Sequence, residues 1–289
     1  MPKELKTPTT YQEQISIMTS RGIIISDPAK CEDFLSHVNY YRLSGYIYPF
    51  LDHTIDKCRT PIDFSVISDL YAFDAAMRSL IFSTIEVIEI YNRNQFSYYS
   101  AHSYGADGYM LPEYYNSKHD HQKFLSRING CIRDNKNAPA VRHHMRVYGG
   151  KFPIWVIIDY FSLGMMSYFY SDMLNADKAK LAQNMYSVNY QTLSSWLRCL
   201  TDLRNRCAHY SRLFNWKFPS TPRMPQDDNF TPDRSLFTQL YMLKLMYPYP
   251  DRWNDSFVNP LDSILCEHNF ALVMEHVGIP QNWKTILSR

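Results

Sequence analysis

The stretch from Phe64 to about Tyr99 constrains the fold of this chain most. Apolar residues recur along it mostly at steps of three and four residues, as in Leu70, Phe73, Met77, Leu80, Ile81, Ile85 and Ile88. This spacing matches one face of an α-helix, which completes a turn in about 3.6 residues. Opposite charges stand four residues apart in Asp74 with Arg78 and in Glu89 with Arg93, and such pairs support a helix. The stretch therefore predicts one long helix.

Helical spacing also dominates the rest of the chain, whereas alternating strand patterns are short and rare. Further helices are expected over Thr9–Gly22, from Ser26 or Asp27 through the block YYRLSGY at Tyr40–Tyr46, within Phe152–Met173 from Pro153 onwards, over Ser235–Met246 and near Pro260–His276. We expect a polar loop over Asp52–Pro61, a less regular segment over Ala101–Lys151 and a capped, charged turn over Asn175–Lys180. These patterns predict an all-α bundle.

Composition limits the class of protein. With 23 Tyr and 16 Phe but only 9 Gly, the chain favours closely packed helices over a turn-rich sheet. A formal net charge of +2 argues against strong, indiscriminate binding of nucleic acid, but it leaves room for a local basic groove. The six cysteines lack CxxC spacing and are expected to be reduced, mostly packed thiols. The polar N-terminus and the lack of an apolar run of ~20 residues predict a cytoplasmic protein without a membrane span.

A second helical stretch, Leu193–Trp216, separates its polar residues from its apolar ones. Arg198, Asp202, Asn205, His209 and Arg212 are spaced so that a helix would align them in one polar stripe. The opposite face carries Leu193, Trp196, Leu197, Leu200, Leu203 and Cys207. Arg204 falls at the edge of the apolar face, where an unpaired guanidinium is costly to bury. Arg204 therefore needs a partner.

The residue types in this stretch suit chemistry on a phosphate. A guanidinium can form two parallel hydrogen bonds with a phosphate, and a nearby histidine can transfer protons at neutral pH. This combination is suited to RNA cleavage. The alternative is that Arg204 and His209 are ordinary surface or structural residues, because an arginine followed by a histidine occurs by chance on many helices.

Several blocks of the sequence resemble known families. Arg204 and Asn205, three further residues and His209 resemble the active-site motif of HEPN-domain ribonucleases, which type VI CRISPR effectors also carry. The wider segment RNRCAHYSRLFNW is similar to the Abi-like family of bacterial abortive-infection phage-resistance proteins, the AbiD/AbiF group. YYRLSGY, the LYAFDAAMR segment that leads into Glu86 and Glu89, and the block from Pro153 to Gly164 also match, although Asp159 stands where the family typically has Glu. The resemblance covers roughly residues 7–216.

The resemblance implies a HEPN-like helical bundle with helical N-terminal and C-terminal extensions. We expect an N-terminal helical segment at 1–60, a core at 61–216, and a proline-rich connector with a C-terminal helical appendage at 217–289. The implied activity is a metal-independent endoribonuclease without a cofactor, in which Arg204, Asn205 and His209 catalyse attack by a ribose 2′-hydroxyl. The implied partners are RNA, a second copy of the chain, and an antitoxin or a regulatory RNA or protein, in the bacterial cytoplasm.

Helix geometry also bears on the second copy. On an ideal helix Arg204 and His209 lie about 140° apart around the axis, so one straight helix presents them poorly to a single phosphate. Either the helix distorts near Cys207, or a symmetric partner completes the site. The homodimer is our prediction.

Residues outside the motif are candidates for holding RNA. Arg212, Arg42 and Arg93 could bind phosphates, and Tyr41 could stack on a base. The alternative for the tyrosine block is packing between helices. The alternative for Arg93 is an ion-pair stripe with Glu86 and Glu89 beside the helix of Arg204. The run RHHMRVYGGK at 142–151 is a candidate for phosphate contact or a solvated loop. The HDH cluster at 119–121 lacks the spacing of one helix face, so no metal site is expected.

A competing hypothesis is a non-catalytic module that recognises RNA or a partner protein through the same helix. Arg204 and His209 would then serve an interface. Both functions need a basic, aromatic-lined groove, so the sequence leaves both open. No GxxxxGK loop is present, and an NTP-driven mechanism therefore has no support.

Overall fold

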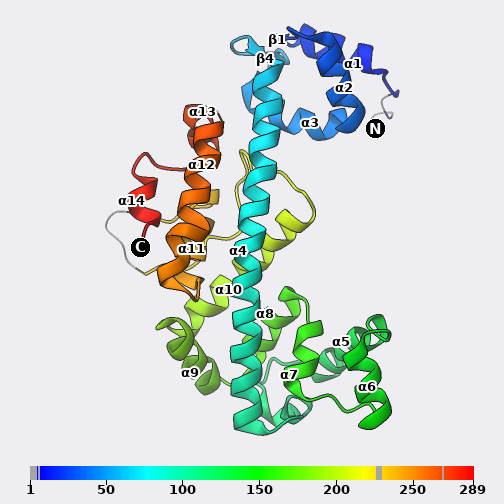
Figure 1. Ribbon diagram of the computed structural model, residues 1–289, viewed down its shortest axis with the longest axis vertical. Helices are drawn as coiled ribbons and strands as arrows, with labels where there is room; N and C mark the ends of the chain where they lie inside the picture. Colours follow the sequence, from blue (N-terminus) through cyan, green and yellow to red (C-terminus); the bar gives the residue numbers. More distant parts are fainter. Residues whose placement is uncertain (1–4, 6, 226–229, 269) are drawn as a thin grey trace.

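The computed structural model describes residues 5, 7–225, 230–268 and 270–289. Its central element is α4, Phe64–Tyr104, a helix of 41 residues that runs through the middle of the molecule (Figure 1). Asp63 caps this helix by accepting a hydrogen bond from the N–H of Ser65, and Gly105 follows its last turn with a φ of +80°. The prediction of one long helix from Phe64 is confirmed, and the helix continues to Tyr104.

Short helices lie beside the start of α4 (Figure 1): α1 Tyr11–Ser20, α2 Pro28–His37 and α3 Tyr40–Ile47. The prediction of one helix from Asp27 through Tyr46 was wrong. Val38 is extended, and the side chain of Asn39 caps a new helix by accepting from the N–H of Tyr41. The expected loop at Asp52–Pro61 contains most of one small antiparallel pair, β2 Leu51–Asp52, which follows the 3-10 turn η1 Tyr48–Phe50, with β3 Lys57–Cys58. A second pair, β1 Ile23–Ile24 parallel to β4 Ile62–Asp63, lies outside that loop.

The segment expected to be less regular contains two helices, α5 His121–Asp134 and α6 Pro139–Val147, after the 3-10 turns η2 Gly108–Met110 and η3 Pro112–Tyr114. Their apolar stripes are narrow, because α5 buries Phe124 and Ile128 and α6 buries only Val141. Each buried face is short, and the sequence analysis missed both helices. The expected helix from Pro153 is broken: α7 Ile154–Ile157 and η4 Ile158–Tyr160 precede α8 Leu163–Asp172, which Ser162 caps.

The next two helices bring the motif against α4. The expected turn at Asn175–Lys180 is the start of a helix, α9 Asn175–Tyr186. It ends at Ser187, whose left-handed conformation turns the chain into α10, Tyr190–Ala208. Helix α10 contacts α4, α8 and α9. Its apolar face is buried as predicted, in Leu193, Trp196, Leu197, Leu200, Leu203 and Cys207.

The C-terminal helices lie together along one side of α4 (Figure 1). The expected helix at Ser235–Met246 is present as α11, Leu236–Met246, with Ser235 as its cap. The expected helix near Pro260–His276 is instead two helices, α12 Asn259–Glu267 and α13 Phe270–Val277. They are preceded by η5 Pro250–Arg252 and the π-helical turn η6 Asn254–Val258, and they are followed by α14 Trp283–Leu287. The expected proline-rich connector includes residues 226–229, which lie outside the described residues.

The prediction of an all-α fold is confirmed, since the strands are two residues each. The division at residues 60 and 216 stays a prediction. All six cysteines are free thiols, and Cys31, Cys199 and Cys207 are buried. None of the helices among the described residues has both the length and the apolar character needed to cross a membrane.

Candidate functional site

Helix α10 places the motif residues in its last two turns. Arg204 and Asn205 are helical, the helix ends at Ala208, and His209 is its C-terminal cap. The backbone N–H of His209 still bonds to the carbonyl of Asn205, at 3.0 Å. Arg204 is partly buried, whereas Asn205 and His209 are exposed. The motif therefore lies where the helix meets the following loop.

Tyr210 ends the helix, because its φ of +54° is left-handed. The N–H groups of Tyr210 and Ser211 bond back to the carbonyls of Cys207 and Arg206. These two bonds form a Schellman motif, in which a glycine usually holds the left-handed position. Arg212 lies beyond this turn. The expectations that the helix continues to residue 216 and that Arg212 shares its polar stripe were therefore wrong.

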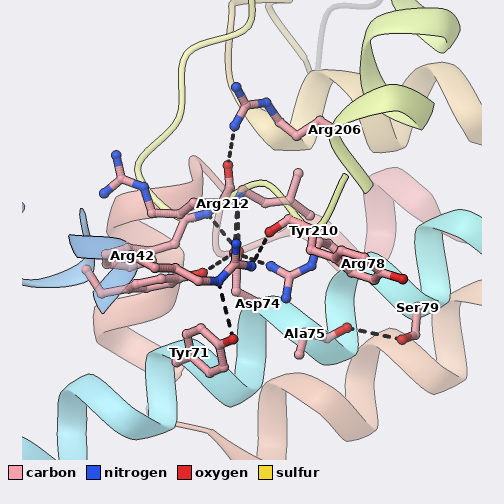
Figure 2. A network of polar contacts seen from close by, with 12 residues as sticks. Arg42, Tyr71, Asp74, Ala75, Arg78, Ser79, Arg206, Tyr210 and Arg212 are labelled. Carbon is pink, nitrogen blue, oxygen red and sulfur yellow. Dashed lines mark hydrogen bonds and ion pairs between the residues drawn. The ribbon is translucent and has the colours of Figure 1, made fainter. Parts of the chain in front are cut away.

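Asp74 of α4 fixes the loop that follows this turn (Figure 2). Its buried carboxylate accepts hydrogen bonds from the N–H groups of Leu213, at 2.9 Å, and Phe214, at 2.8 Å. The Tyr46 hydroxyl and Nη1 of Arg78 each donate to Oδ2 from 2.7 Å. Burial raises the pKa of Asp74 above its usual range, and these four donors oppose the rise. The predicted pairing of Asp74 with Arg78 is confirmed, at 2.7 Å.

Sequence reasoning did not predict that Asp74 anchors a loop. Asp74 follows Leu70 by four residues and precedes Met77 by three, so it lies on the apolar face of α4. A carboxylate at such a position must find donors when it is buried. That position was the available signal, but the chain segment that supplies the donors is 139 residues away.

Arg42 of α3 holds the turn from the other side (Figure 2). Its Nη2 donates to the carbonyl of Tyr210, and its Nε donates to the hydroxyl of Tyr71 at 3.3 Å. The guanidinium is therefore engaged in structural bonds. Neighbouring Tyr41 is 88% exposed and accessible for stacking. A role for Arg42 and Tyr41 in RNA binding stays a prediction.

Two further arginines flank the loop. Nη1 of Arg206 donates to the carbonyl of Arg212 at 2.6 Å, and its guanidinium lies 3.5 Å from the centre of the Trp216 ring. The Arg212 guanidinium lies over Tyr46, and its buried Nη1 has no hydrogen-bond partner among the described residues. Burial lowers the pKa of both arginines. Arg212 thus remains a candidate anion ligand, although it is not on α10.

Two adjoining hollows lie between α4 and the end of α10, and we call them together the α4 groove. The larger has a volume of about 600 Å³ and is lined by Ala75, Arg78, Ser79, Phe82, Ser83, Glu86, Cys207, Ala208 and Tyr210. The smaller, about 260 Å³, is lined by Phe82, Ile85, Glu86, Glu89, Ile90, Arg93 and Arg204. They share Phe82 and Glu86. Apolar side chains are exposed along the groove, with Phe82 at 42%, Ile90 at 60% and Tyr210 at 71%.

Arg204 reaches into the smaller hollow without a carboxylate partner. Its Nη1 donates to Oδ1 of Asn205 at 3.3 Å, and its buried Nε has no hydrogen-bond partner in the part of the chain that the structure describes. Glu86 and Glu89 share the hollow with Arg204, but no ion pair with Arg204 forms among the described residues. Among the described residues, the partner that the sequence indicated for Arg204 is therefore missing at Nε.

Glu89, which shares the smaller hollow with Arg204, pairs with Arg93 instead. The guanidinium of Arg93 pairs with Glu89 and donates to the carbonyls of Ile158 and Phe161, the latter at 2.7 Å. The predicted pairing of Arg93 with Glu89 is confirmed. These bonds fasten the connection between α7 and α8 to α4, and a role for Arg93 in binding phosphate stays a prediction.

His209 lines neither hollow of the α4 groove. Its sequence neighbours Ala208 and Tyr210 line the larger one, and His209 itself is exposed. Among the described residues no side-chain hydrogen bond joins His209 to Arg204 or Asn205. The structure thus brings Arg204 and Asn205 together and leaves His209 apart, as expected from the angle between residues 204 and 209 on a helix.

The histidines of the HDH cluster are engaged with each other. Nδ1 of His119 lies 2.9 Å from Oδ2 of Asp172, and its Nε2 lies 3.2 Å from Nδ1 of His121. Within the described residues, no three His, Cys, Asp or Glu side chains are grouped so that they could hold a metal ion.

Comparison with known proteins places this architecture in a family. The family model for the Abi-like protein matches residues 33–215, which is more than half of the 289-residue chain. The chain belongs to the Abi-like family. The matched segment of this Abi-like protein contains α4, α10 and the loop anchored by Asp74. No curated protein and no solved structure matches the chain.

Proposed function

We propose that this Abi-like protein acts in abortive infection as a metal-independent endoribonuclease of the HEPN type, in the bacterial cytoplasm. The observation that carries the proposal is Arg204, which lines the groove next to Asn205 and whose buried Nε has no hydrogen-bond partner among the described residues. A buried cationic group without a partner is unfavourable. A phosphate oxygen in the groove would remove that penalty.

The proposed reaction needs only groups of this chain and the RNA. His209 removes the proton of a ribose 2′-hydroxyl, whose oxygen forms a bond to the adjacent phosphorus while the bond to the 5′-oxygen breaks. A proton passes to the leaving 5′-oxygen, which gives a 2′,3′-cyclic phosphate and a 5′-hydroxyl. Arg204 binds the negative charge that gathers on the phosphate. Asn205, which accepts from Arg204 through Oδ1, has its Nδ2 to donate to the phosphate.

A second copy of the chain completes the proposed site. Phe82, Ile90 and Tyr210 expose apolar surface along the groove, and a two-fold related copy would bury it while bringing two sets of motif residues together. Such a contact also explains how His209, which lines neither hollow, reaches a phosphate bound by Arg204. We propose that an antitoxin or a regulatory RNA or protein restrains this activity before infection.

RNA cleavage in the presence of EDTA tests the proposal. Wild-type protein should cleave a labelled RNA, because a 2′-hydroxyl nucleophile needs no metal-bound water, and a substrate with a 2′-deoxy sugar at the cleaved position should resist. His209→Ala should lose at least about 100-fold in rate, the usual range for a proton-transfer group. Arg204→Ala should lose about 100- to 1000-fold, the range for removing one donor that stabilises transition-state charge. Arg133→Ala and His37→Ala serve as matched controls, since both side chains are exposed, at 76% and 72%. Equal rates for all five proteins would mean that the motif is not catalytic.

Light scattering and mixing of variants test the second copy. Phe82→Asp should give monomers with little activity, whereas a fully active monomer would rule out the shared site. Mixing Arg204→Ala with His209→Ala protein distinguishes two arrangements. A site that uses Arg204 of one chain and His209 of the other regains part of its activity, whereas a site that needs all four residues stays inactive.

Binding without cleavage would favour the non-catalytic alternative. In that case RNA or a partner protein would be retained by wild-type protein and lost with Arg204→Ala, while no 2′,3′-cyclic phosphate product would form. Expression in bacteria gives a separate measurement. Growth arrest by wild-type protein that both motif variants abolish supports the nuclease, and equal toxicity of all three contradicts it.

A further inference from the structure

A hollow far from the motif has the chemistry of a nucleotide-binding slot. It lies between the end of α6 and the start of α7, has a volume of about 430 Å³ and is lined by residues that include His144, Tyr148, Lys151, Phe152, Pro153 and Trp155. Trp155 is 52% exposed and Tyr148 is 54% exposed. Aromatic rings left in solvent at the mouth of a hollow need an explanation, because aromatic side chains usually bury most of their surface.

The walls of this α6–α7 hollow are fixed before any ligand binds. Nδ1 of His144 donates to the carbonyl of Ala140 at 2.9 Å, so Nε2 is the ring nitrogen that can bond a ligand. The His144 ring is stacked on Phe152 with centres 5.3 Å apart. The carbonyl of Phe152 accepts from the Tyr109 hydroxyl at 2.7 Å, and the N–H of Ile154 donates to the carbonyl of Ala106 at 2.8 Å. Preformed walls reduce the entropy lost on binding.

The chain segment that supplies most of the lining of the hollow is rich in positive charge, and its Lys151 lines the hollow. Residues 135–158 contain Lys136, Arg142, Arg146 and Lys151 but neither Asp nor Glu, in a protein with a net charge of only +2. Arg142, Arg146 and Lys151 are exposed. Asp107 also lines the hollow, and its carboxylate could accept from the N–H groups of a base. Cations beside stacked aromatic rings are the usual means of holding a single-stranded nucleic acid.

We infer that the α6–α7 hollow binds an unstacked base of single-stranded RNA. Trp155 and Tyr148 stack on the base, and Lys151 and Arg146 bind the neighbouring phosphates. The choice of RNA rests on the proposed function. Met145 and Val147 are exposed nearby and would suit a protein surface, but the acid-free basic segment and the narrow aromatic hollow favour a polyanion with flat bases.

This hollow would hold substrate at a distance from the cleavage site. Arg93, in the α4 groove, precedes the end of α4 at Tyr104 by roughly 17 Å of helix. Ala106, which lines the α6–α7 hollow, follows directly after that end. The two sites are therefore separate and can be disabled one at a time.

Fluorescence anisotropy with a labelled oligo(U) of about 12 nucleotides tests the inference. All proteins are full length and carry His209→Ala, so that cleavage does not remove the probe. Adding Trp155→Ala should weaken binding roughly 5- to 100-fold, the range for loss of one base stack. Tyr249→Ala is the matched control, since Tyr249 is 51% exposed and lies outside both sites. A duplex RNA of the same length should bind more weakly than the single strand, because its bases are not free to stack.

Salt dependence provides a second readout that a purely structural role would not change. Lys151→Gln should lower the slope of log Kd against log salt by about 0.7, the value for one lost phosphate contact on a single strand. Lys180→Gln, at an exposed lysine on α9, should leave the slope unchanged. If Trp155→Ala does not fold, Tyr148→Ala and Lys151→Gln still decide the question.

The outcomes separate this inference from the proposed function. Any of three results overturns the inference. They are no RNA binding at low salt, equal affinity of the parent and its Trp155, Tyr148 and Lys151 variants, and equal binding of duplex and single strand. Cleavage by wild-type protein combined with a negative binding result leaves the nuclease standing. Binding that depends on Trp155 without any cleavage supports the inference and contradicts the nuclease.

Discussion

Replacing Asp74 by Asn tests how the loop after the motif is held. In Asp74, Oδ1 accepts from the N–H groups of Leu213 and Phe214, at 3.1 and 2.8 Å, and Oδ2 accepts from Tyr46 and Arg78. An asparagine with its oxygen in the Oδ1 position keeps the bond from Phe214, but its amide nitrogen replaces Oδ2, which accepts the shorter bond from Leu213, at 2.9 Å. Its amide nitrogen then faces the Tyr46 hydroxyl, which can accept in place of donating.

The expected loss of stability comes from Arg78. Its guanidinium is 8% exposed and would face an amide N–H₂ in place of a carboxylate oxygen. Breaking a buried pair by removing one partner costs about 3–5 kcal/mol. An exposed pair costs far less, about 0–1 kcal/mol, and Asp56, which is 63% exposed and pairs with Arg21, is the matched control.

Urea unfolding followed by fluorescence of the five tryptophans measures the effect. Asp74→Asn should lower the free energy of unfolding by about 3–5 kcal/mol and Asp56→Asn by less than about 1 kcal/mol. Adding Arg78→Met to Asp74→Asn should restore part of the loss, since the unpaired charge is then absent. A loss below about 1 kcal/mol for Asp74→Asn would refute the argument that this carboxylate holds both the buried charge of Arg78 and the N–H of Leu213 in the loop.

The remaining predictions concern the turn and the thiols. In urea unfolding, the free energy of unfolding of Tyr210→Gly should exceed that of Tyr210→Ala by about 1 kcal/mol, because only glycine occupies the left-handed conformation without strain. Equal stability of the two variants would mean that the turn is not strained. In the cleavage assay, Arg42→Ala should lower the rate, since it frees the carbonyl of Tyr210, and an unchanged rate would show that the turn needs no such bond. Burial raises the pKa of Cys207 to about 12, so iodoacetamide near pH 8 should modify exposed Cys266 first and Cys207 only in urea, as measured by mass spectrometry; early modification of Cys207 would contradict its burial.

The elements that sequence reasoning found are those with a strong local period. Helices α4 and α10 each carry a continuous apolar face, and a period of about 3.6 residues is visible without knowledge of any other segment. The starts of α1 and α2 were located to within one residue for the same reason, because the capping residues Thr10 and Asp27 bond within their own turns. Helices α5, α6 and α9 were missed because their buried apolar faces are short: α5 buries two side chains, α6 buries one, and the buried face of α9 includes the polar Asp177 and Lys178.

By itself the sequence determined the all-α class, the family and the presence of Arg204, Asn205 and His209 in one helical stretch. Tertiary structure decided where that helix stops and what surrounds it. The end at Tyr210 depends on Arg42, 168 residues away, and on the loop bonds of Asp74. Such bonds form only after distant segments meet, and no local pattern encodes them. The same holds for the unpartnered nitrogen of Arg204, which only the packing of α10 on α4 reveals.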